Sequence, residues 1–331
     1  MHAPEISSDN EILSSLRKRT KEITEGIESE IDELHRLNPY KRSMEFLSFG
    51  ILYVFGATLA YFSKGNIIIT ISGIICMGIS LNSLCILIHE GLHGLLAERP
   101  WVNHLLSFIV GLPILISATA YQTTHANHHY EIGRKLDYGT YRQHLKSPTL
   151  IWLAYFTQLL LGSLVYIACI PFLAYKVANK RSRFFIVAEC CIIIPCAVTV
   201  CLIADPASIL IYWAYPIVIM SLLTNIRGLA SHALGDVENL YLSSRTIKSS
   251  KLVSFLFLHE NYHLEHHIFP GAPSYSLRKI HELTWKRLPE TLYAKSYRQF
   301  LINFFQAALK RDLTPMGIVH PIKNLERTPA E

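Results

Sequence analysis

Charged residues are scarce in this chain. Only 17% of its 331 residues are Asp, Glu, Lys or Arg, whereas 50% are hydrophobic. A soluble domain usually carries about 25% charged residues, so this chain has too few to cover a soluble globule of its length. The composition therefore excludes an ordinary soluble domain and predicts an integral membrane protein.

Three further absences narrow the class of protein. No run of Arg and Lys with interleaved aromatic residues is present, so the net charge of +6 does not indicate a nucleic-acid partner. The start, residues 1–10, lacks the basic segment and apolar core of a cleaved signal peptide. The seven cysteines lie in apolar segments and form no Cys-x-x-Cys pair, so we interpret them as small buried side chains.

Four apolar stretches approach the length of about 20 residues that a membrane span needs. They cover residues 46–63, 66–88, 184–203 and 208–226, and short turns at 63–66 and 204–207 join them in pairs. Basic residues precede each pair: Arg36, Lys41 and Arg42 before the first, and Lys176, Lys180, Arg181 and Arg183 before the second. Because positive flanks stay in the cytosol, both turns are predicted to lie outside.

Two other apolar stretches, 101–120 and 149–174, fit this layout less simply. We interpret both as re-entrant or interfacial segments, with breaks at Gly111-Leu112-Pro113 in the first and at Gly162 and Pro171 in the second. The alternative is that they are ordinary spanning helices.

The two ends of the chain are more polar than its middle. In residues 5–37, apolar residues recur on one helical stripe, which predicts a cytosolic amphipathic helix ending before Pro39, or alternatively a helix on the bilayer surface. We expect three regions: a cytosolic N-terminal region over 1–44, a membrane domain over 45–285 and a cytosolic tail over 286–331. The fold class is an all-α integral membrane protein, with four transmembrane helices in two hairpins, re-entrant or interfacial helices and a cytosolic cap.

Nine histidines stand beside the apolar stretches in four groups. They are His89 and His93; His125, His128 and His129; His232; and His263, His266 and His267. All four groups fall on the predicted cytosolic side. Imidazole is the commonest neutral metal ligand and suits iron, zinc and copper. Nine ligands exceed the needs of one ion, so the count predicts a dinuclear metal site at a membrane face.

The spacing of these histidines suits a shared site. His89 and His93 are four residues apart, and each His-x-x-His-His group repeats at three and four, so each group lies on one helix face. The remaining histidines are expected to be ordinary surface or core residues, except that His259 precedes His263 by one helical turn and stays open.

A second reading starts from His89-Glu90-x-x-His93, which is also the pattern of zinc proteases, with the Glu as general base. That reading leaves both His-x-x-His-His groups unexplained. Zinc has no redox chemistry, whereas iron can activate dioxygen. A site at the membrane face of an apolar scaffold therefore favours oxidation of an unactivated C–H bond in a lipid chain.

Carboxylates stand beside the histidine groups. They are Glu90, Asp137, Asp236, Glu260 and Glu265. Such groups typically accept the outer ring N–H of a metal-bound His and fix its orientation. Alternatively, they are solvated surface carboxylates.

The motifs together resemble those of the membrane fatty-acid desaturase superfamily. The resemblance covers about residues 45–285 and rests on the histidine groups and on the run from Asn261 to Pro270, which reads Asn-Tyr-His-Leu-Glu-His-His-Ile-Phe-Pro. It implies a non-haem di-iron centre with all nine histidines as ligands, in the cytosolic cap, and oxygen-dependent desaturation of a lipid or acyl chain. Neither a fused cytochrome b5 signature nor a ferredoxin cysteine set is present, so we expect a separate electron donor, either ferredoxin or cytochrome b5 with a reductase.

Two departures from the superfamily pattern leave the reaction outcome open. Gly228 stands where some acyl-CoA members have an Asn that holds a metal-bound water, for which Asn225 and Asn261 are the possible substitutes, and Ser231 stands where many bacterial relatives have an acidic residue. The candidate partners behind the ligands are Glu90, Asn225, Asn261 and Glu265. The alternative reaction is hydroxylation or keto-group formation on a lipid, carotenoid or small amphiphile. We expect a multi-pass protein of a bacterial inner membrane, rather than of the endoplasmic reticulum, with its site facing the cytosol.

Overall fold

The computed structural model describes residues 18, 20–126, 128–131, 137, 147–235, 239–289 and 291–309. Helices dominate this part of the chain, and two short strands pair in parallel. The helices are α2 (Glu28–Leu34), α3 (Pro39–Tyr61), α4 (Ile67–Leu92), α5 (Pro100–Gly111), α6 (Ala118–His125), α7 (His128–Glu131), α8 (Pro148–Val177), α9 (Lys180–Ile203), α10 (Pro206–Ile209), α11 (Tyr215–His232), α12 (Leu240–Ser243), α13 (Lys251–Leu256), α14 (His263–Ile268), α15 (Ser274–Thr284) and α16 (Tyr297–Leu309). The strands are β1 (Arg245–Ile247) and β2 (Leu292–Ala294).

Helices α3 and α4 form a hairpin over the first predicted pair of spans. Asn38 caps α3, which has Pro39 in its first turn, and Asn66 caps α4 by accepting from the backbone N–H groups of Ile68 and Ile69. The two helices cross closely, because a Cβ added at Gly56 would lie 2.6 Å from the carbonyl oxygen of Gly73. Small residues at this crossing allow the backbones to touch, as in packed membrane helices.

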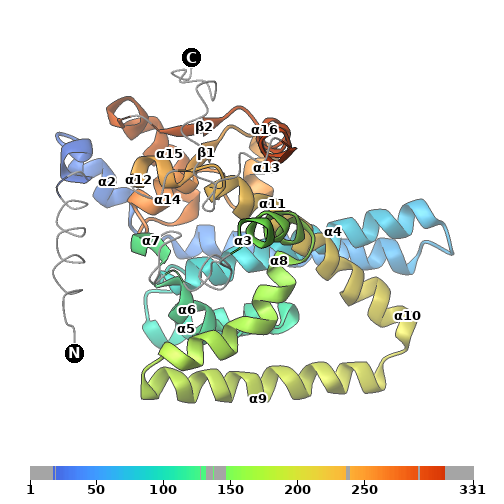
Figure 1. Cartoon of the computed structure of the whole chain (residues 1–331). Coiled ribbons are helices and arrows are strands. Elements are labelled where there is room, and N and C mark those ends of the chain that lie inside the picture. Colours follow the sequence, from blue (N-terminus) through green and yellow to red (C-terminus); the bar gives the residue numbers. More distant parts are fainter. Residues whose placement is uncertain are drawn as a thin grey trace.

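The second predicted pair is also present. Helix α9 is followed by a turn at Ala204 and Asp205, and Asp205 caps α10, which runs through a π-helical segment, Leu210–Ala214, into α11. Figure 1 shows the α3–α4 turn and the α9–α10 junction at the same end of the molecule, on the right. Five helices among the described residues are long and apolar enough to cross a membrane: α3, α4, α8, α9 and the stretch Pro206–His232. The structure thus has one candidate span more than the sequence predicted.

The extra candidate is α8, for which the predicted breaks are wrong. The helix runs without interruption from Pro148 to Val177 and includes both Gly162 and Pro171. Asn225 of α11 inserts its amide beside α8, accepting from the N–H of Ser163 at 2.7 Å and donating to the carbonyl of Leu159 at 3.3 Å. Gly162 makes room for this insertion, because a Cβ there would lie 3.2 Å from the Asn225 Oδ1. Glycine therefore serves helix packing here rather than chain breaking.

The other irregular stretch is broken where the sequence predicted. Helix α5 ends at Gly111, a 3₁₀ turn covers Leu112–Ile114, and Leu115 has a left-handed backbone with φ of 60°. The pair Pro100–Ile114 and Ala118–His125 meets at 105°. The chain thus turns sharply before α6, and the end of α6 is aimed back toward the end of α4.

The N-terminal stripe packs on the protein itself. Ile23 and Ile31 are buried in a cluster with Leu264 of α14 and with Leu277 and Ile280 of α15. A turn at residues 25–26 separates α2 from the helical residues 20–24, so the described part of the predicted amphipathic helix is interrupted. This stripe faces protein rather than lipid.

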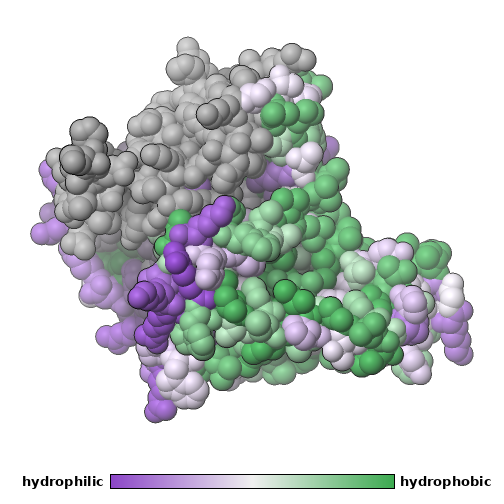
Figure 2. Space-filling model, turned by 60° about the horizontal axis from the view of Figure 1, so that its bottom comes forward, coloured by the Kyte–Doolittle hydropathy of each residue, from purple (hydrophilic) through white to green (hydrophobic). Residues whose placement is uncertain are grey.

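An apolar surface surrounds the long helices. Figure 2 shows hydrophobic residues spread across this face, with polar residues gathered at its two ends. Exposed side chains such as Ile68, Leu202 and Ile203 are more than 70% accessible, which water would disfavour and a bilayer would not. The structure therefore supports an all-α membrane protein, with the small β1–β2 pair as an addition that the sequence analysis did not predict.

Candidate metal centre

All nine predicted histidines converge in the structure, from five helices. His89 lies in the last turn of α4 and His93 caps it; His125 ends α6, His128 and His129 begin α7, His232 ends α11, and α14 carries the last three. They form a five-histidine group (His89, His93, His125, His129 and His266) and a four-histidine group (His128, His232, His263 and His267).

The ring nitrogens within the five-histidine group point at one another. The Nε2 atoms of His89 and His125 are 3.1 Å apart, those of His125 and His129 are 3.0 Å apart, and those of His129 and His93 are 3.1 Å apart. His266 lies against this set, with its ring centroid 4.7 Å from that of His89.

The four-histidine group has the same arrangement. His232 Nε2 is 3.2 Å from His128 Nε2 and 2.9 Å from His263 Nε2, and His263 is 3.2 Å from His267. The two groups touch, because the ring centroids of His129 and His267 are 4.4 Å apart.

These distances fit two metal ions. Imidazole nitrogens that bind one ion at about 2.1 Å in perpendicular directions lie about 3.0 Å apart. The buried ring nitrogens of His266 have no hydrogen-bond partner among the described residues, although buried polar atoms are normally paired. The residues present therefore suit a pair of ions better than a set of internal hydrogen bonds.

Burial favours the neutral, metal-binding form of several of these histidines. Burial lowers the pKa of His263, His266 and His267 well below the ordinary value of 6.5, and neighbouring imidazoles lower it further. Burial likewise lowers the pKa of His93 to about 4. At neutral pH these rings need lose no proton before they bind a cation.

Hydrogen-bond acceptors lie beside the outer nitrogen, Nδ1, of several of the rings. His128 Nδ1 is 3.1 Å from Asp137 Oδ2, and His232 Nδ1 is 3.1 Å from the carbonyl oxygen of Ser243. Glu260 contacts both groups: its Oε2 is 3.0 Å from His263 Nδ1, and its Oε1 is 3.7 Å from His89 Nδ1. Burial raises the pKa of Glu260 to about 7, although the charge of Arg227 lowers it. Glu260 thus lies between the two histidine groups, on the Nδ1 side of His263 and His89.

Glu90 belongs to a buried ion network. Its Oε2 accepts from Arg42 Nη2 and from the backbone N–H of Ser274, and Arg42 also bonds Glu45 at 2.6 Å. Arg42 and Glu90 are almost fully buried. The network ties the start of α3 and the start of α15 to the end of α4, which carries His89. In the sequence, Arg42 indicates only the membrane topology, and its position at the start of an apolar helix gives no sign of this ion network.

Three other predicted partners make bonds elsewhere. Glu265 binds Thr246 and His281, and Asn261 binds Ser254 and the carbonyl oxygen of Ile247. The amide of Asn225 is taken up by α8 and Ser221. Asp236 lies outside the described residues. The water-holding role of the two asparagines stays a prediction; in this structure both amides bond to protein groups.

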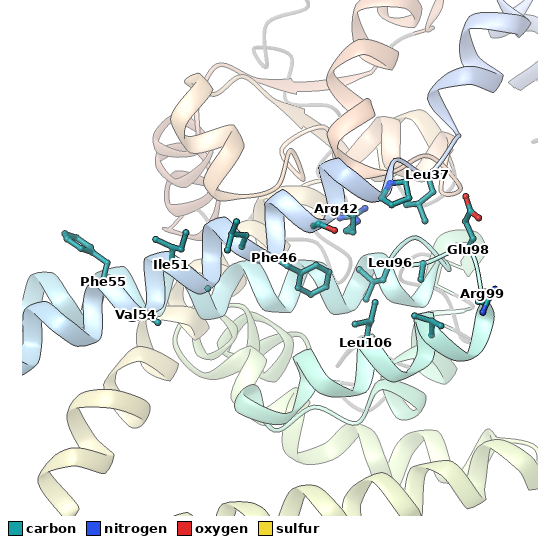
Figure 3. Close-up of a pocket in the computed structure, with 16 residues that line it drawn as sticks. Leu37, Arg42, Phe46, Ile51, Val54, Phe55, Leu96, Glu98, Arg99 and Leu106 are labelled. Carbon is teal, nitrogen blue, oxygen red and sulfur yellow. The ribbon is translucent and has the colours of Figure 1, made fainter.

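Two grooves flank the body that carries the centre. One, of about 1050 Å³, lies between α3, residues 95–99 and α5, and Figure 3 shows Phe46, Leu96 and Leu106 lining it. Arg42 also lines it. The other, of about 1010 Å³, lies between α4, α11, α13 and α16. Either could admit an apolar chain.

The comparison with known families agrees with this geometry. No curated protein matches the chain closely. A family model described as fatty acid desaturase matches residues 66–300, which include every histidine of both groups and well over half of the sequence. The chain therefore belongs to the fatty acid desaturase family.

Proposed function

We propose that this protein desaturates a fatty-acyl chain, using dioxygen, a di-iron centre held by its nine histidines, and electrons from a separate donor. The observation that carries the proposal is the convergence of nine imidazoles, six of them buried, in two touching groups, in a chain of this family. In the overall reaction the substrate loses two hydrogen atoms from adjacent carbons. The substrate supplies half of the electrons that reduce dioxygen to water, and the donor supplies the other half.

The chain's own residues hold and shape the centre. Iron bound by the two groups supplies the redox chemistry and dioxygen activation that protein side chains lack. Imidazole is a neutral ligand, so Asp137 and Glu260 would offset part of the metal charge, and they orient the imidazoles of His128 and His263. Burial of six of the nine rings limits the access of bulk water, which reduces side reactions.

The protease reading has less support from this geometry. A general base must lie within hydrogen-bond reach of the water it activates. The Oε2 of Glu90 is instead held by Arg42 and by the Ser274 backbone. A single zinc would also leave one of the two histidine groups without a role.

The four-span layout, with its turns outside and its centre facing the cytosol, is part of the proposal. His129 precedes α8 and His232 ends α11, yet both lie at one centre. The chain between them must therefore cross the membrane an even number of times. Because α9 and the stretch Pro206–His232 form a pair, α8 is the helix that does not cross completely. Tags in the turns 62–66 and 204–205 should report the side opposite to a tag at the N-terminus.

The proposal is tested by lipid mass spectrometry of cells that express the protein, with His267→Ala as the matched control. We expect acyl chains with an additional double bond in the wild type alone. Chains that gain oxygen instead would establish a hydroxylase or ketolase, and unchanged lipids with one zinc per purified chain would overturn the proposal.

A further inference from the structure

The groove between α4, α11, α13 and α16 has a cationic mouth. Lys248, Lys295 and Arg298 line it, together with Ser249, Ser250 and Ser296, and no Asp or Glu is among its described lining residues. No carboxylate of the described chain forms an ion pair with Lys248 or Arg298. An excess of positive charge beside an apolar groove favours an anionic amphiphile.

The groove between α3 and α5 is different, because its charges are balanced within the protein. Arg42 is bonded to Glu45 and Glu90, and Glu98 lines the groove beside Arg99 (Figure 3). Both grooves have similar volumes and apolar walls, so charge is what separates them.

Two buried donors lie deeper in the cationic groove. The Asn82 Nδ2 and the Tyr297 hydroxyl are buried and have no hydrogen-bond partner among the described residues, and both residues line the groove. A buried donor without a partner destabilises the protein, and an acceptor from a ligand would relieve this cost. Much of the remaining wall is apolar and includes Leu223, Ile226 and Phe257.

The groove shares helix α4 with the metal centre, and apolar side chains lie exposed beside it. Asn82 precedes His89 by seven residues on α4, which places it on nearly the same helix face about 10 Å away. At the outer side, Leu252 and Phe255 of α13 and Ile302 of α16 are 65%, 40% and 46% exposed. Apolar side chains beside cations are typical of a segment at the bilayer interface.

We propose that this groove binds a membrane phospholipid. Lys248, Lys295 and Arg298 bind its phosphate, Asn82 and Tyr297 donate to its ester carbonyls, and one acyl chain follows α4 and α11 toward the histidines. The groove thus offers cations for the phosphate, neutral donors for the esters and apolar walls for the chain. That this lipid is also the substrate rests on the proposed function; its binding does not.

The test is native mass spectrometry of the purified full chain in a neutral detergent, with added dioleoyl phosphatidylglycerol or phosphatidylcholine. We expect phosphatidylglycerol to bind about tenfold more tightly, because each cation near a lipid surface contributes about 1 kcal/mol. The double variant Lys248→Gln, Arg298→Gln should lose this preference. Arg99→Gln, in the balanced groove, is the matched control and should keep it.

Tyr297→Phe separates the ester contact from the charge contact. It removes one hydroxyl and no charge, so it should weaken both lipids alike and leave the preference unchanged. Equal binding of both lipids by the wild type, or loss of the preference in Arg99→Gln, would overturn the inference. So would displacement of phosphatidylglycerol by an equal concentration of oleoyl-coenzyme A, which would identify a soluble thioester as the occupant.

The binding measurement is independent of turnover, since it needs neither iron nor an electron donor. Retained phosphatidylglycerol preference in chelator-treated protein, with no change in cellular lipids, would contradict the proposed function and leave the groove inference intact. Desaturation of cellular lipids by a protein that lacks this lipid preference would contradict the groove inference and leave the proposed function intact.

Discussion

The two histidine groups differ in the hydrogen-bond partners of their outer ring nitrogens, Nδ1. In the four-histidine group, three of the four rings have an acceptor at Nδ1: Asp137 for His128, the Ser243 carbonyl for His232 and Glu260 for His263. In the five-histidine group, the Nδ1 atoms of His89, His129 and His266 have no hydrogen-bond partner among the described residues, and Glu260 approaches His89 only to 3.7 Å.

This difference suggests two ways of holding a metal ion. Outer acceptors fix the tautomer and direction of a ring, so few ligands suffice. Without them, an additional ligand supplies the affinity. We infer that the four-histidine group is the more rigid one and that the five-histidine group tolerates the loss of a ligand better.

Removal of a ligand should have the largest effect and should distinguish the groups. His128→Ala leaves three histidines in its group, and we expect iron to fall from about two to about one per chain, because a stable site usually keeps at least about four ligands. His266→Ala leaves four, and we expect most of the iron to be retained at lower affinity. Both variants should lose more than about 100-fold in activity, beyond the usual cost of losing an outer partner. Iron content by plasma emission spectrometry checks this, and equal iron loss in both variants would contradict the asymmetry.

Glu260→Gln should have the second largest effect, because this side chain lies beside both histidine groups. We expect a loss of about 10–100-fold in activity or metal affinity, with iron leaving both sites together during titration with a chelator. Glu265→Gln is the control, since its carboxylate binds Thr246 and His281 instead. If Glu260→Gln released iron from one site alone, the link between the groups would be wrong.

Asp137→Asn tests whether the two metal sites are held independently. Asp137 stands behind His128, in the four-histidine group. We expect about tenfold weaker affinity for one ion and an unchanged affinity for the other. The measurement is competition with a graded series of chelators, and two equally weakened sites would count against separate holding of the ions.

Glu90→Gln should leave the centre loaded and active. The carboxylate pairs with Arg42 rather than with a ring nitrogen, so its loss leaves Arg42 less well compensated and lowers stability, by up to about 3 kcal/mol for a buried pair. We expect a lower unfolding temperature, with iron and lipid oxidation still measurable. Peptide cleavage by the wild type that disappears in this variant would instead support the protease reading.

The smallest expected effect concerns His281, which lies behind Glu265 and away from the two groups. Burial lowers its pKa, but the hydrogen bond and charge of Glu265 outweigh burial and raise it above 6.5. The protonated pair therefore stabilises the fold below about pH 6.5 and loses this contribution as the pH rises through the raised pKa. His281→Gln should flatten this part of the stability profile, measured by unfolding temperature against pH, without changing the iron content. An unchanged profile would show that the pair contributes nothing to stability.

Local patterns in the sequence determined much of this molecule. The apolar lengths, the caps at Asn38, Asn66 and Asp205, and the turns between them specify the two helical pairs, because each depends on neighbouring residues. The spacing of His89 and His93, and of the two His-x-x-His-His groups, determined which imidazoles share a helix face, since helix geometry repeats every 3.6 residues.

Tertiary structure decided what depends on residues far apart in the chain. The division of nine histidines into five and four follows from how α4, α6, α7, α11 and α14 meet, and no spacing encodes it. The continuity of α8 depends on Asn225, inserted from another helix beside Gly162, and the position of Glu260 between the groups depends on the loop that follows α13. The face of a helix on which a residue lies depends on nearby sequence. The residues that it contacts from other helices depend on packing, which is determined only in the folded chain.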